Sequence, residues 1–366
     1  MRLVYDHQIF VFQEYGGISR YICELADHVA MIDGFDVEIL APLHLNHYLR
    51  DCSHARVTGK YIRSVPKTVG LRQKISDLIV KRHLHKDPPD VLHETYYFTS
   101  RLSPKKTKIV TTIHDMIPEK FGEAHSAYDK ITSAKAVAVN RADHIVCISD
   151  NTRKDLIELL NVDPQKISVI HHGHSFKVHG ACQDEKRIVA KPYILYVGLR
   201  TSYYKNFKRL LQSYATSVHI TKQFSLVCFG GGRFRADEIN EMKRLNILEN
   251  VVQLSGDDNS LANLYSHASA FVYPSLYEGF GIPLLEAMSY RCPVVCSNCS
   301  SFPEVAGDAA EYFDPLSTES IAYALERVLT SSERSETLIA RGEKRVQQFS
   351  WEKCADQTQL IYSSLC

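Results

Sequence analysis

The stretch FVYPSLYEGFGIPLLEAMSY, residues Phe271–Tyr290, changes its pattern half-way along. It opens with an apolar, β-branched and aromatic run typical of a buried strand that ends at Pro274. A loop with two glycines follows, and Pro283 suits the first turn of a helix. A strand, a glycine-bearing loop and a helix in this order are the building unit of parallel α/β sheets, so the stretch predicts that fold class.

The rest of the chain repeats this alternation of short apolar runs and helical patterns, and we expect two parallel sheets. The clearest helix is Ile18–Ala30, whose apolar side chains recur on one face. The strands expected in the first sheet are Arg2–Gln8, Asp36–Ala41, Val91–Glu94, Lys108–His114, His144–Ser149 and Lys166–His171. Those expected in the second are Tyr193–Gly198, Ser225–Phe229, Val251–Leu254, Phe271–Pro274, Pro293–Ser297 and Ala310–Phe313.

The length of 366 residues, 45% of them apolar, is sufficient for two domains with a core each. Helical periodicity fails between His174 and Pro192, where the chain is polar and carries Gly and Pro, so we expect the interdomain linker there. The predicted domains span residues 1–180 and 190–346. Residues 347–366 are expected to form a helix that packs back towards the N-terminal domain.

Charge and composition exclude several classes of protein. Lys and Arg number 43 against 42 Asp and Glu, so no overall positive field attracts nucleic acid. No segment approaches the roughly 18 apolar residues of a membrane-spanning helix. Asp6 and His7 interrupt the apolar run that a secretory signal requires, and the ten cysteines are too sparse for a disulfide scaffold. We expect a cytoplasmic protein with reduced thiols.

Two carboxylates flank the turn into the helix of the first stretch. Glu278 lies in the loop and Glu286 in the first turn of the expected helix, with seven residues between them. The backbone amides of Phe280, Gly281 and Ile282 and the helix dipole suit a phosphate, whereas the carboxylates suit hydroxyl groups. Each Glu taken alone is explained as readily by helix stabilisation or by a solvated loop.

A second loop, GLRTSYYKN at residues Gly198–Asn206, follows an expected strand and carries Arg200 and Lys205 with four residues between them. Together, Glu278-GFGIPLL-Glu286 and Arg200-x4-Lys205-Asn resemble the signatures of family four retaining glycosyltransferases of the GT-B fold. The likeness extends over nearly the whole chain and is strongest to O-antigen and exopolysaccharide mannosyl- or rhamnosyltransferases. It implies two Rossmann-like domains that face a central cleft, an N-terminal one for the acceptor and a C-terminal one for a nucleotide sugar.

The resemblance also implies roles for single residues. Arg200 and Lys205 would hold the donor diphosphate, where negative charge gathers as the bond to the sugar breaks. Glu278 would contact hydroxyls of the donor sugar, and Glu286 those of the ribose. The donor-binding set is completed by the loop and helix-tip residues Gly279, Phe280, Gly281 and Ile282, and by the glycine pair Gly16 and Gly17 of the N-terminal domain.

His114 and Asp115 end an apolar run in the N-terminal half. A lone His at a strand end is usually structural, and a His-Asp pair also occurs in metal phosphohydrolases, which are all-helical. The resemblance implies that His114 lies beside the reacting sugar and acts in catalysis with Glu278, Arg200 and Lys205. Asp115, and Arg20 behind the glycine pair, are candidate acceptor contacts.

No metal or other cofactor is expected. The sequence contains no Asp-x-Asp pair, the motif with which the competing glycosyltransferase architecture binds a divalent ion. Cys292, Cys296 and Cys299 have the C-x3-C-x2-C spacing of an iron–sulfur site. Because Val294 and Val295 between them indicate a strand, we favour core thiols over a cluster.

The function implied is transfer of a hexose, mannose from GDP-mannose as the best guess, to a glycan or lipid-linked acceptor in surface polysaccharide synthesis. A UDP- or dTDP-sugar is the alternative donor. A non-catalytic sugar-nucleotide-binding subunit is the alternative from another class, although it would have lost Glu278, Arg200 or Lys205. The basic segment Leu71–Lys86 predicts either an ordinary helix with a solvated face or peripheral contact with anionic lipid at the inner membrane face.

Overall fold

The computed structural model describes residues 1–65, 67–122, 126–174 and 187–366. The chain forms two compact units. Unit 1 comprises Met1–Gly173 with Ser350–Cys366, and unit 2 comprises His174–Phe349. The linker expected between residues 174 and 192 falls largely on 175–186, which lie outside the described residues.

Unit 1 is built on a seven-stranded parallel sheet of order β3-β2-β1-β4-β5-β6-β7. Its middle strands are short and almost wholly buried, as expected for a parallel sheet covered on both faces. The strands are β1 (Arg2–Tyr5), β2 (Asp36–His44), β3 (Arg56–Tyr61), β4 (Val91–Glu94), β5 (Lys108–Ile113), β6 (His144–Cys147) and β7 (Ile167–Val169).

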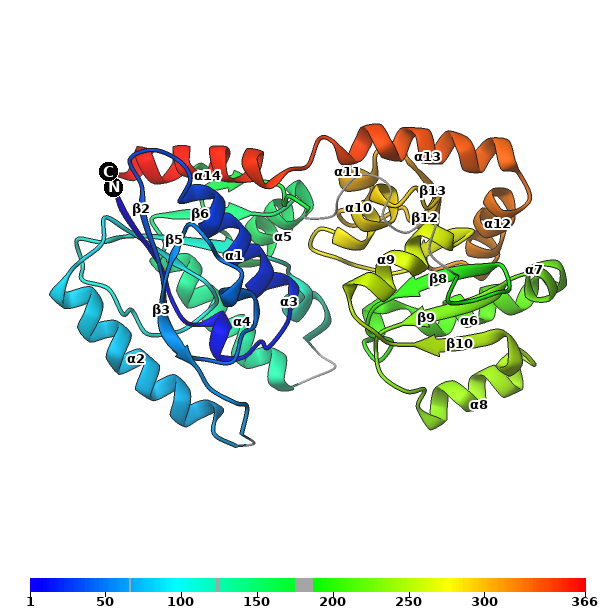
Figure 1. Ribbon diagram of the computed structural model, residues 1–366, viewed down its shortest axis with the longest axis horizontal. Coiled ribbons are helices and arrows are strands. Elements are labelled where there is room, and N and C mark those ends of the chain that lie inside the picture. Colours follow the sequence, from blue (N-terminus) through cyan, green and yellow to red (C-terminus); the bar gives the residue numbers. More distant parts are fainter. Residues whose placement is uncertain (66, 123–125, 175–186) are drawn as a thin grey trace. The chain divides into compact units, whose positions relative to one another are not determined.

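Helices cover this sheet, and the last helix of the chain returns to pack beside the first, as Figure 1 shows at the top of unit 1. The α-helices are α1 (Gly17–Val29), α2 (Val69–Lys86), α3 (Ile117–Phe121), α4 (Ser126–Arg141), α5 (Asp150–Leu160) and α14 (Trp351–Leu365). Short 3-10 turns are η1 (Ile9–Val11), η2 (Tyr48–Arg50) and η4 (Pro164–Lys166).

Unit 2 contains a six-stranded parallel sheet of order β10-β9-β8-β11-β12-β13. Its strands are β8 (Tyr193–Val197), β9 (Ser225–Phe229), β10 (Val251–Leu254), β11 (Ala270–Tyr273), β12 (Val294–Ser297) and β13 (Ala310–Phe313). Its helices are η5 (Tyr203–Lys205), α6 (Phe207–Thr216), α7 (Val218–Gln223), α8 (Ala236–Arg244), η6 (Leu248–Asn250), α9 (Asp258–His267), α10 (Ile282–Ser289), α11 (Phe302–Ala306), α12 (Thr318–Leu329) and α13 (Ser332–Val346).

The predicted α/β class with two parallel sheets is confirmed, and the largest differences from the expected strands are in unit 1. The sequence pattern did not predict β3, an edge strand whose residues are polar and mostly exposed. The first strand is also shorter than expected. The carboxylate of buried Asp6 accepts hydrogen bonds from the amides of Gln8 (3.2 Å) and Thr95 (3.0 Å) and so draws the chain out of the sheet after Tyr5.

The C-terminal helix α14 belongs to the core of unit 1. Trp351, Ile361 and Tyr362 are buried among side chains of β1 and α1. The hydroxyl of Tyr362 lies 2.9 Å from that of Tyr5 and 2.6 Å from Nδ1 of His93. Buried polar groups need such partners, so these contacts fix the helix in place as well as covering apolar surface.

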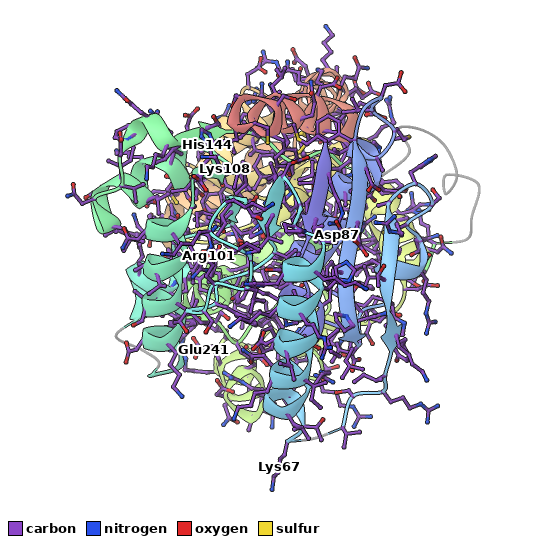
Figure 2. The ribbon with its side chains drawn as sticks, turned by 90° about the vertical axis from the view of Figure 1, so that its left-hand side faces the viewer. Lys67, Asp87, Arg101, Lys108, His144 and Glu241 are labelled. Carbon is purple, nitrogen blue, oxygen red and sulfur yellow. The ribbon has the colours of Figure 1, made fainter. Side chains whose placement is uncertain are left out.

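Helix α2 differs from an ordinary surface helix. Its buried residues are Arg72, Ser76, Val80 and Leu84, whereas its large apolar side chains point outward: Leu71 is 63% exposed, Ile75 40%, Leu78 70% and Ile79 43%. Figure 2 shows α2 at the front of unit 1, with Lys67 just before its first turn and Asp87 just after its last. None of the helices in the described parts of the chain has the length and apolar character needed to cross a membrane.

Candidate functional site

The candidate site lies at the carboxyl ends of β8 and β11, the two strands at the centre of the unit 2 sheet. The chain order reverses there, because β9 and β10 lie on one side of β8 and β12 and β13 beyond β11. Loops that leave adjacent parallel strands in opposite directions open a crevice, and open α/β sheets bind ligands in this crevice. The two sequence motifs of unit 2 follow these two strands.

Backbone contacts tie the two loops together. The amide of Leu276 donates to the carbonyl of Tyr204 at 2.7 Å. Asn206 takes a left-handed conformation, with φ of 57°, and its side-chain amide donates to the carbonyls of Pro274 (3.0 Å) and Pro315 (2.7 Å). Asn tolerates this conformation better than most residues, which explains why Asn follows Lys205 at this turn.

Lys205 and Glu278 form an ion pair, with Nζ 2.6 Å from Oε1, and each side chain is 12% exposed. The same carboxylate oxygen accepts a hydrogen bond from Ser275 Oγ at 2.8 Å. Lys205 Nζ also lies 3.3 Å from the hydroxyl of Tyr273, and burial next to Glu278 raises the pKa of that phenol well above its usual value. The ammonium and the carboxylate are therefore held side by side, each with surface left for a ligand.

The turn into α10 needs a glycine, because Gly281 has φ of 104°. Two serines from the segment before α11 hold this turn. Ser300 Oγ donates to the carbonyl of Glu278 at 2.7 Å, and Ser301 Oγ donates to that of Phe280 at 2.8 Å. With these carbonyls engaged, the amides of the first turn of α10 and the positive end of its dipole form the tip expected to attract an anion.

Glu286 lies further along α10, where its carboxylate accepts a hydrogen bond from the hydroxyl of Tyr265 at 2.9 Å. Burial and this carboxylate raise the pKa of Tyr265 well above its usual value, so the phenol stays protonated and acts as the donor. Tyr265 thus orients one oxygen of Glu286. Both carboxylates of the motif therefore belong to α10 or the loop that leads into it.

Arg200 lies in the same loop as Lys205 but has different partners. Its guanidinium is buried, with Nε 2.9 Å from Glu238 Oε1 and the side chain only 1% exposed. Nη1 donates to the carbonyl of Gly230 at 2.7 Å, and Nη2 donates to that of Gly232 at 2.7 Å. The structure brings Lys205 and Glu278 together and directs Arg200 to the loop after β9.

Three consecutive glycines, Gly230, Gly231 and Gly232, have positive φ angles of 81°, 69° and 71° in that loop. A Cβ on Gly231 would lie 2.8 Å from Arg200 Nη1 and 3.0 Å from the carbonyl oxygen of Gly198. The glycines therefore allow the backbone to wrap around the guanidinium. Glu238 also accepts the amide of Arg235 at 2.7 Å, and this bond starts α8 directly after the loop.

The predicted residues of unit 1 lie at the carboxyl edge of its own sheet. His114 follows β5, is 6% exposed and receives an edge contact from Tyr21, with ring centroids 5.2 Å apart. Burial, reinforced by the nearby His172, lowers the pKa of His114 well below its usual value, so the imidazole is neutral at neutral pH. Its Nε2 has no hydrogen-bond partner among the described residues.

The remaining unit 1 candidates are held by local contacts. Asp115 Oδ1 accepts the amide of Ile117 at 3.0 Å, which turns the chain into α3. Gly16 precedes α1 and Gly17 is its first residue. Arg20 is half-buried in the next turn, with its guanidinium carbon 6.0 Å from the ring centre of Tyr48. These unit 1 residues remain candidates for ligand contacts.

The three cysteines of the iron–sulfur alternative are not arranged as ligands of a cluster in the structure. Cys292 and Cys296 are buried, and burial raises the pKa of the Cys296 thiol well above its usual value. Cys299 Sγ contacts the carbonyl oxygen of Leu276 at 3.3 Å, in the loop after β11. Among the residues that the structure describes, no three His, Cys, Asp or Glu side chains gather as metal ligands.

Comparison with known proteins agrees with this geometry. A family profile described as "Glycosyltransferase Family 4" matches residues 15–176, and one described as "Glycosyl transferases group 1" matches residues 183–345. The O-antigen chain mannosyltransferase B of Escherichia coli is 32% identical over 290 residues, covering 74% of this chain and 73% of its own. The chain belongs to the family 4 glycosyltransferases.

Two further comparisons place this glycosyltransferase among its relatives. The O-antigen chain mannosyltransferase RfbU of Salmonella typhimurium is 27% identical over 319 residues, covering 85% of this chain and 87% of its own. The crystal structure of the Anabaena protein HepE with UDP-glucose superposes with a TM-score of 0.73 at 16% identity, covering 100% of both chains. The predicted GT-B fold, with two Rossmann-like parallel-sheet domains, is confirmed.

Several residues of the glycosyltransferase site were not predicted from the sequence. Glu238 belongs to a polar helix start, and Ser275, Ser300 and Ser301 have no spacing that marks them. Tyr273 ends a buried strand and resembles any core tyrosine. The sequence does show that Glu238 is the third residue of a helix with a capping pattern. That pattern indicates capping rather than a partner for Arg200.

Proposed function

We propose that this glycosyltransferase moves a hexose from a nucleotide-diphosphate sugar to a glycan or lipid-linked acceptor, with mannose from GDP-mannose as the preferred donor. The observation that carries the proposal is the pairing of Lys205 with Glu278 beside the tip of α10, at the reversal of strand order in unit 2. The mannosyltransferase names of the two O-antigen relatives favour the choice of sugar.

The pair explains how the site would serve both halves of the donor. In the structure, the carboxylate of Glu278 pairs with the ammonium of Lys205 and neutralises its charge. A diphosphate at the α10 tip would draw the ammonium towards itself, because charge-assisted bonds to phosphate are strong and Lys acts as a point charge. The released carboxylate oxygen would then accept hydroxyls of the sugar, and Glu286 those of the ribose.

The proposed transfer retains the configuration at the anomeric carbon and uses no metal. The bond between the anomeric carbon and the phosphate oxygen breaks first, and both electrons leave with the nucleoside diphosphate. Lys205 and the amides of the α10 tip stabilise that charge. The acceptor hydroxyl attacks from the face that the diphosphate leaves and gives its proton to a phosphate oxygen. His114, neutral and buried, would donate to or accept from a sugar hydroxyl.

The role that we propose for Arg200 differs from the one that the family resemblance implies. The Arg200 guanidinium is only 1% exposed and donates four hydrogen bonds, to Glu238 and to three glycine carbonyls, so it is already engaged away from a diphosphate. We infer that Arg200 supports the donor site by shaping the loop of Gly230, Gly231 and Gly232, which leaves the sheet beside the β8 loop.

A thermal-shift screen tests the donor. GDP-mannose at 100 times its dissociation constant is expected to add about 2.7 kcal/mol to the free energy of unfolding, because it binds only folded protein. UDP-glucose and dTDP-rhamnose at the same concentration as GDP-mannose serve as comparisons, and a larger shift with either would identify that sugar nucleotide as the donor instead. A protein that no nucleotide sugar stabilises, or one that binds a donor but never transfers its sugar, would contradict the enzyme assignment.

The outer face of α2 supports contact with an anionic membrane surface, which we propose to be the inner face of the cytoplasmic membrane. Apolar Leu71, Ile75 and Leu78 are exposed among cationic side chains of the same helix. An ordinary helix would bury that apolar stripe against the sheet, whereas a lipid surface covers it and binds the cations.

Liposome flotation tests this surface. Lys81→Glu with Arg82→Glu is expected to lower partitioning into vesicles of anionic lipid by at least about 30-fold. The loss of two basic residues, at about 1 kcal/mol each, gives that factor, and the two new carboxylates add repulsion. Lys105→Glu with Lys106→Glu makes the same change of charge at two exposed lysines outside α2 and serves as the control. Equal flotation of the two double variants would end the proposal of a specific lipid surface on α2.

A further inference from the structure

Two cysteines of unit 1 lie together in a part of the structure that none of the roles above uses. Cys23 belongs to α1, and Cys52 lies in the turn after η2. The Cys23 side chain is 5% exposed and part of the apolar core of unit 1. Cys52 packs against the same core but remains partly exposed. The two thiols therefore differ in their access to solvent.

A carboxylate clamps the two segments together. Asp27 lies one turn after Cys23, and residues four apart on a helix share a face. Its Oδ1 accepts hydrogen bonds from the three consecutive amides that follow Cys52, those of Ser53 (2.9 Å), His54 (2.7 Å) and Ala55 (2.9 Å). Hydrogen bonds to an ionised carboxylate are stronger than neutral ones. The clamp thus holds the chain at Cys52 against the turn of α1 that carries Cys23.

The two thiols contact each other. A hydrogen bond to the Cys52 thiol, together with burial and the negative charges of Glu24 and Asp27, raises the pKa of the Cys23 thiol well above its usual value. Cys23 therefore keeps its proton at neutral pH. Cys52 Sγ also lies 3.9 Å from the carbonyl oxygen of Tyr48, one turn back in the chain. Both sulfurs are held in place from their own segments.

This arrangement suits oxidation of the thiols better than metal binding or simple packing. Packing explains Cys23, which is buried, but not a partly exposed thiol in a polar turn. Within the described ranges, no third His, Cys, Asp or Glu joins the pair as a metal ligand. In redox-sensitive pairs, by contrast, an accessible thiol reacts with the oxidant and a neighbouring thiol resolves the product. Cys52 matches the first role and Cys23 the second.

We propose that Cys23 and Cys52 form a redox-sensitive site, at which a hydroperoxide converts the two thiols into a disulfide. In the first step the Cys52 sulfur attacks one oxygen of hydrogen peroxide. The O–O bond breaks, and the other oxygen leaves as water with the thiol proton. In the second step the Cys23 sulfur attacks the sulfur of the Cys52 sulfenic acid, the S–O bond breaks, and a second water leaves with the Cys23 proton.

The electrons balance over the two steps. The thiols lose two electrons and two protons, and the peroxide takes them up as two molecules of water. A dithiol such as dithiothreitol reverses the change, because it returns two electrons and two protons and becomes a disulfide itself. The site would therefore respond reversibly to the balance between peroxide and thiol.

The disulfide would act on the loop that precedes α1 and carries the glycine pair. The segment that leads to Cys52 is bound to that loop. The amide of His47 donates to the carbonyl of Glu14 at 3.1 Å, and the side-chain amide of Asn46 donates to the carbonyl of Gln13 at 2.9 Å. A covalent bond from this segment to α1 would tie together both sides of the loop, so oxidation would restrain it.

Peptide mapping by mass spectrometry tests the site on the full chain. Cys366→Ser serves as the starting protein, because it removes an exposed thiol that could link two chains. After hydrogen peroxide, this protein is expected to lose the mass of two hydrogen atoms and two free thiols. One pair of peptides should be linked, through Cys23 and Cys52. Dithiothreitol should restore both thiols.

Thermal unfolding measures the restraint. The bond closes a loop of about 30 residues, so oxidation is expected to raise the unfolding temperature by roughly 5–10 °C. Cys52→Ser in the same starting protein should abolish both the linked peptides and the rise. Cys299→Ser makes the same change at another partly exposed cysteine and should keep both.

Several results would overturn the proposal. They are a disulfide between other cysteines, sulfinic acid without a disulfide, and an oxidised chain that unfolds no higher than the reduced one. Peptide mapping of the protein that retains both cysteines decides the matter even if Cys52→Ser does not fold. No donor or acceptor enters these experiments, so their outcome is independent of the proposed function.

Discussion

Lys205→Ala is expected to lower the rate of sugar transfer by about 10²–10³-fold, which corresponds to a loss of about 2.7–4 kcal/mol in transition-state stabilisation. Lys205 supplies a side-chain cation that is bonded to Glu278, in the loop that leads into α10. Without it, the charge that develops on the leaving diphosphate loses this cation and depends more on backbone amides. The rate is measured as sugar transferred per minute from saturating donor.

Lys208→Ala is the matched control, because Lys208 lies three residues further along the chain and is exposed. It should transfer at nearly the unaltered rate. Thermal unfolding of both variants shows whether unit 2 remains folded. A Lys205→Ala protein that is folded and transfers sugar at more than a tenth of the unaltered rate would remove Lys205 from the mechanism.

Glu278→Gln should separate binding of the nucleotide from transfer of the sugar. The carboxylate neutralises the charge of Lys205, so its loss leaves a more positive site. We expect the variant to bind a nucleoside diphosphate at least as tightly as the unaltered chain. Transfer should nevertheless fall about 10²-fold or more, because a neutral amide bonds the sugar hydroxyls more weakly than a carboxylate does.

Calorimetric titration with GDP and a transfer assay on the same protein preparation measure the two effects. Glu249→Gln changes an exposed residue of η6 that is distant in sequence from Glu278, and it controls for the loss of one negative charge. If Glu278→Gln loses nucleotide affinity in proportion to its loss of rate, the carboxylate acts on the nucleotide or on the fold rather than on the sugar.

The fold was largely predictable because the sequence patterns that indicate its strands are local. Short apolar runs such as Val91–Glu94 and Val294–Ser297 are buried on both faces of a parallel sheet, and the structure has strands at both. The missed strand, Arg56–Tyr61, is an edge strand whose polar sequence carries no such signal. The early end of β1 depends on Asp6 bonding to Thr95, a contact between residues 89 positions apart.

The candidate site was predictable in its residue types but not in its pairings. The spacing of Lys205 and Glu278 places them at loops after strands, and the sheet order brings these loops together. The partner of Arg200, in contrast, was not predictable from the sequence. Whether a loop arginine faces a ligand or a carboxylate such as Glu238 depends on how α8 packs, and single-sequence patterns carry no information on that.

The outward apolar face of α2 was likewise not predictable from the sequence pattern. A helical pattern with Leu71, Ile75 and Leu78 on one side predicts that this side is buried, since burial of apolar surface drives packing. In the structure the buried side is instead that of Arg72 and Val80. The hydrophobic pattern identified the helix, but it did not show which face is buried.

The central claim is that Lys205 and the α10 tip bind the donor diphosphate, and isothermal titration of GDP against guanosine tests it most directly. The ratio of the two dissociation constants isolates the contribution of the phosphates. We predict that the unaltered chain binds GDP at least 100-fold more tightly than guanosine, and that Lys205→Ala reduces this ratio at least tenfold with little change for guanosine. An unchanged ratio in Lys205→Ala would contradict the account.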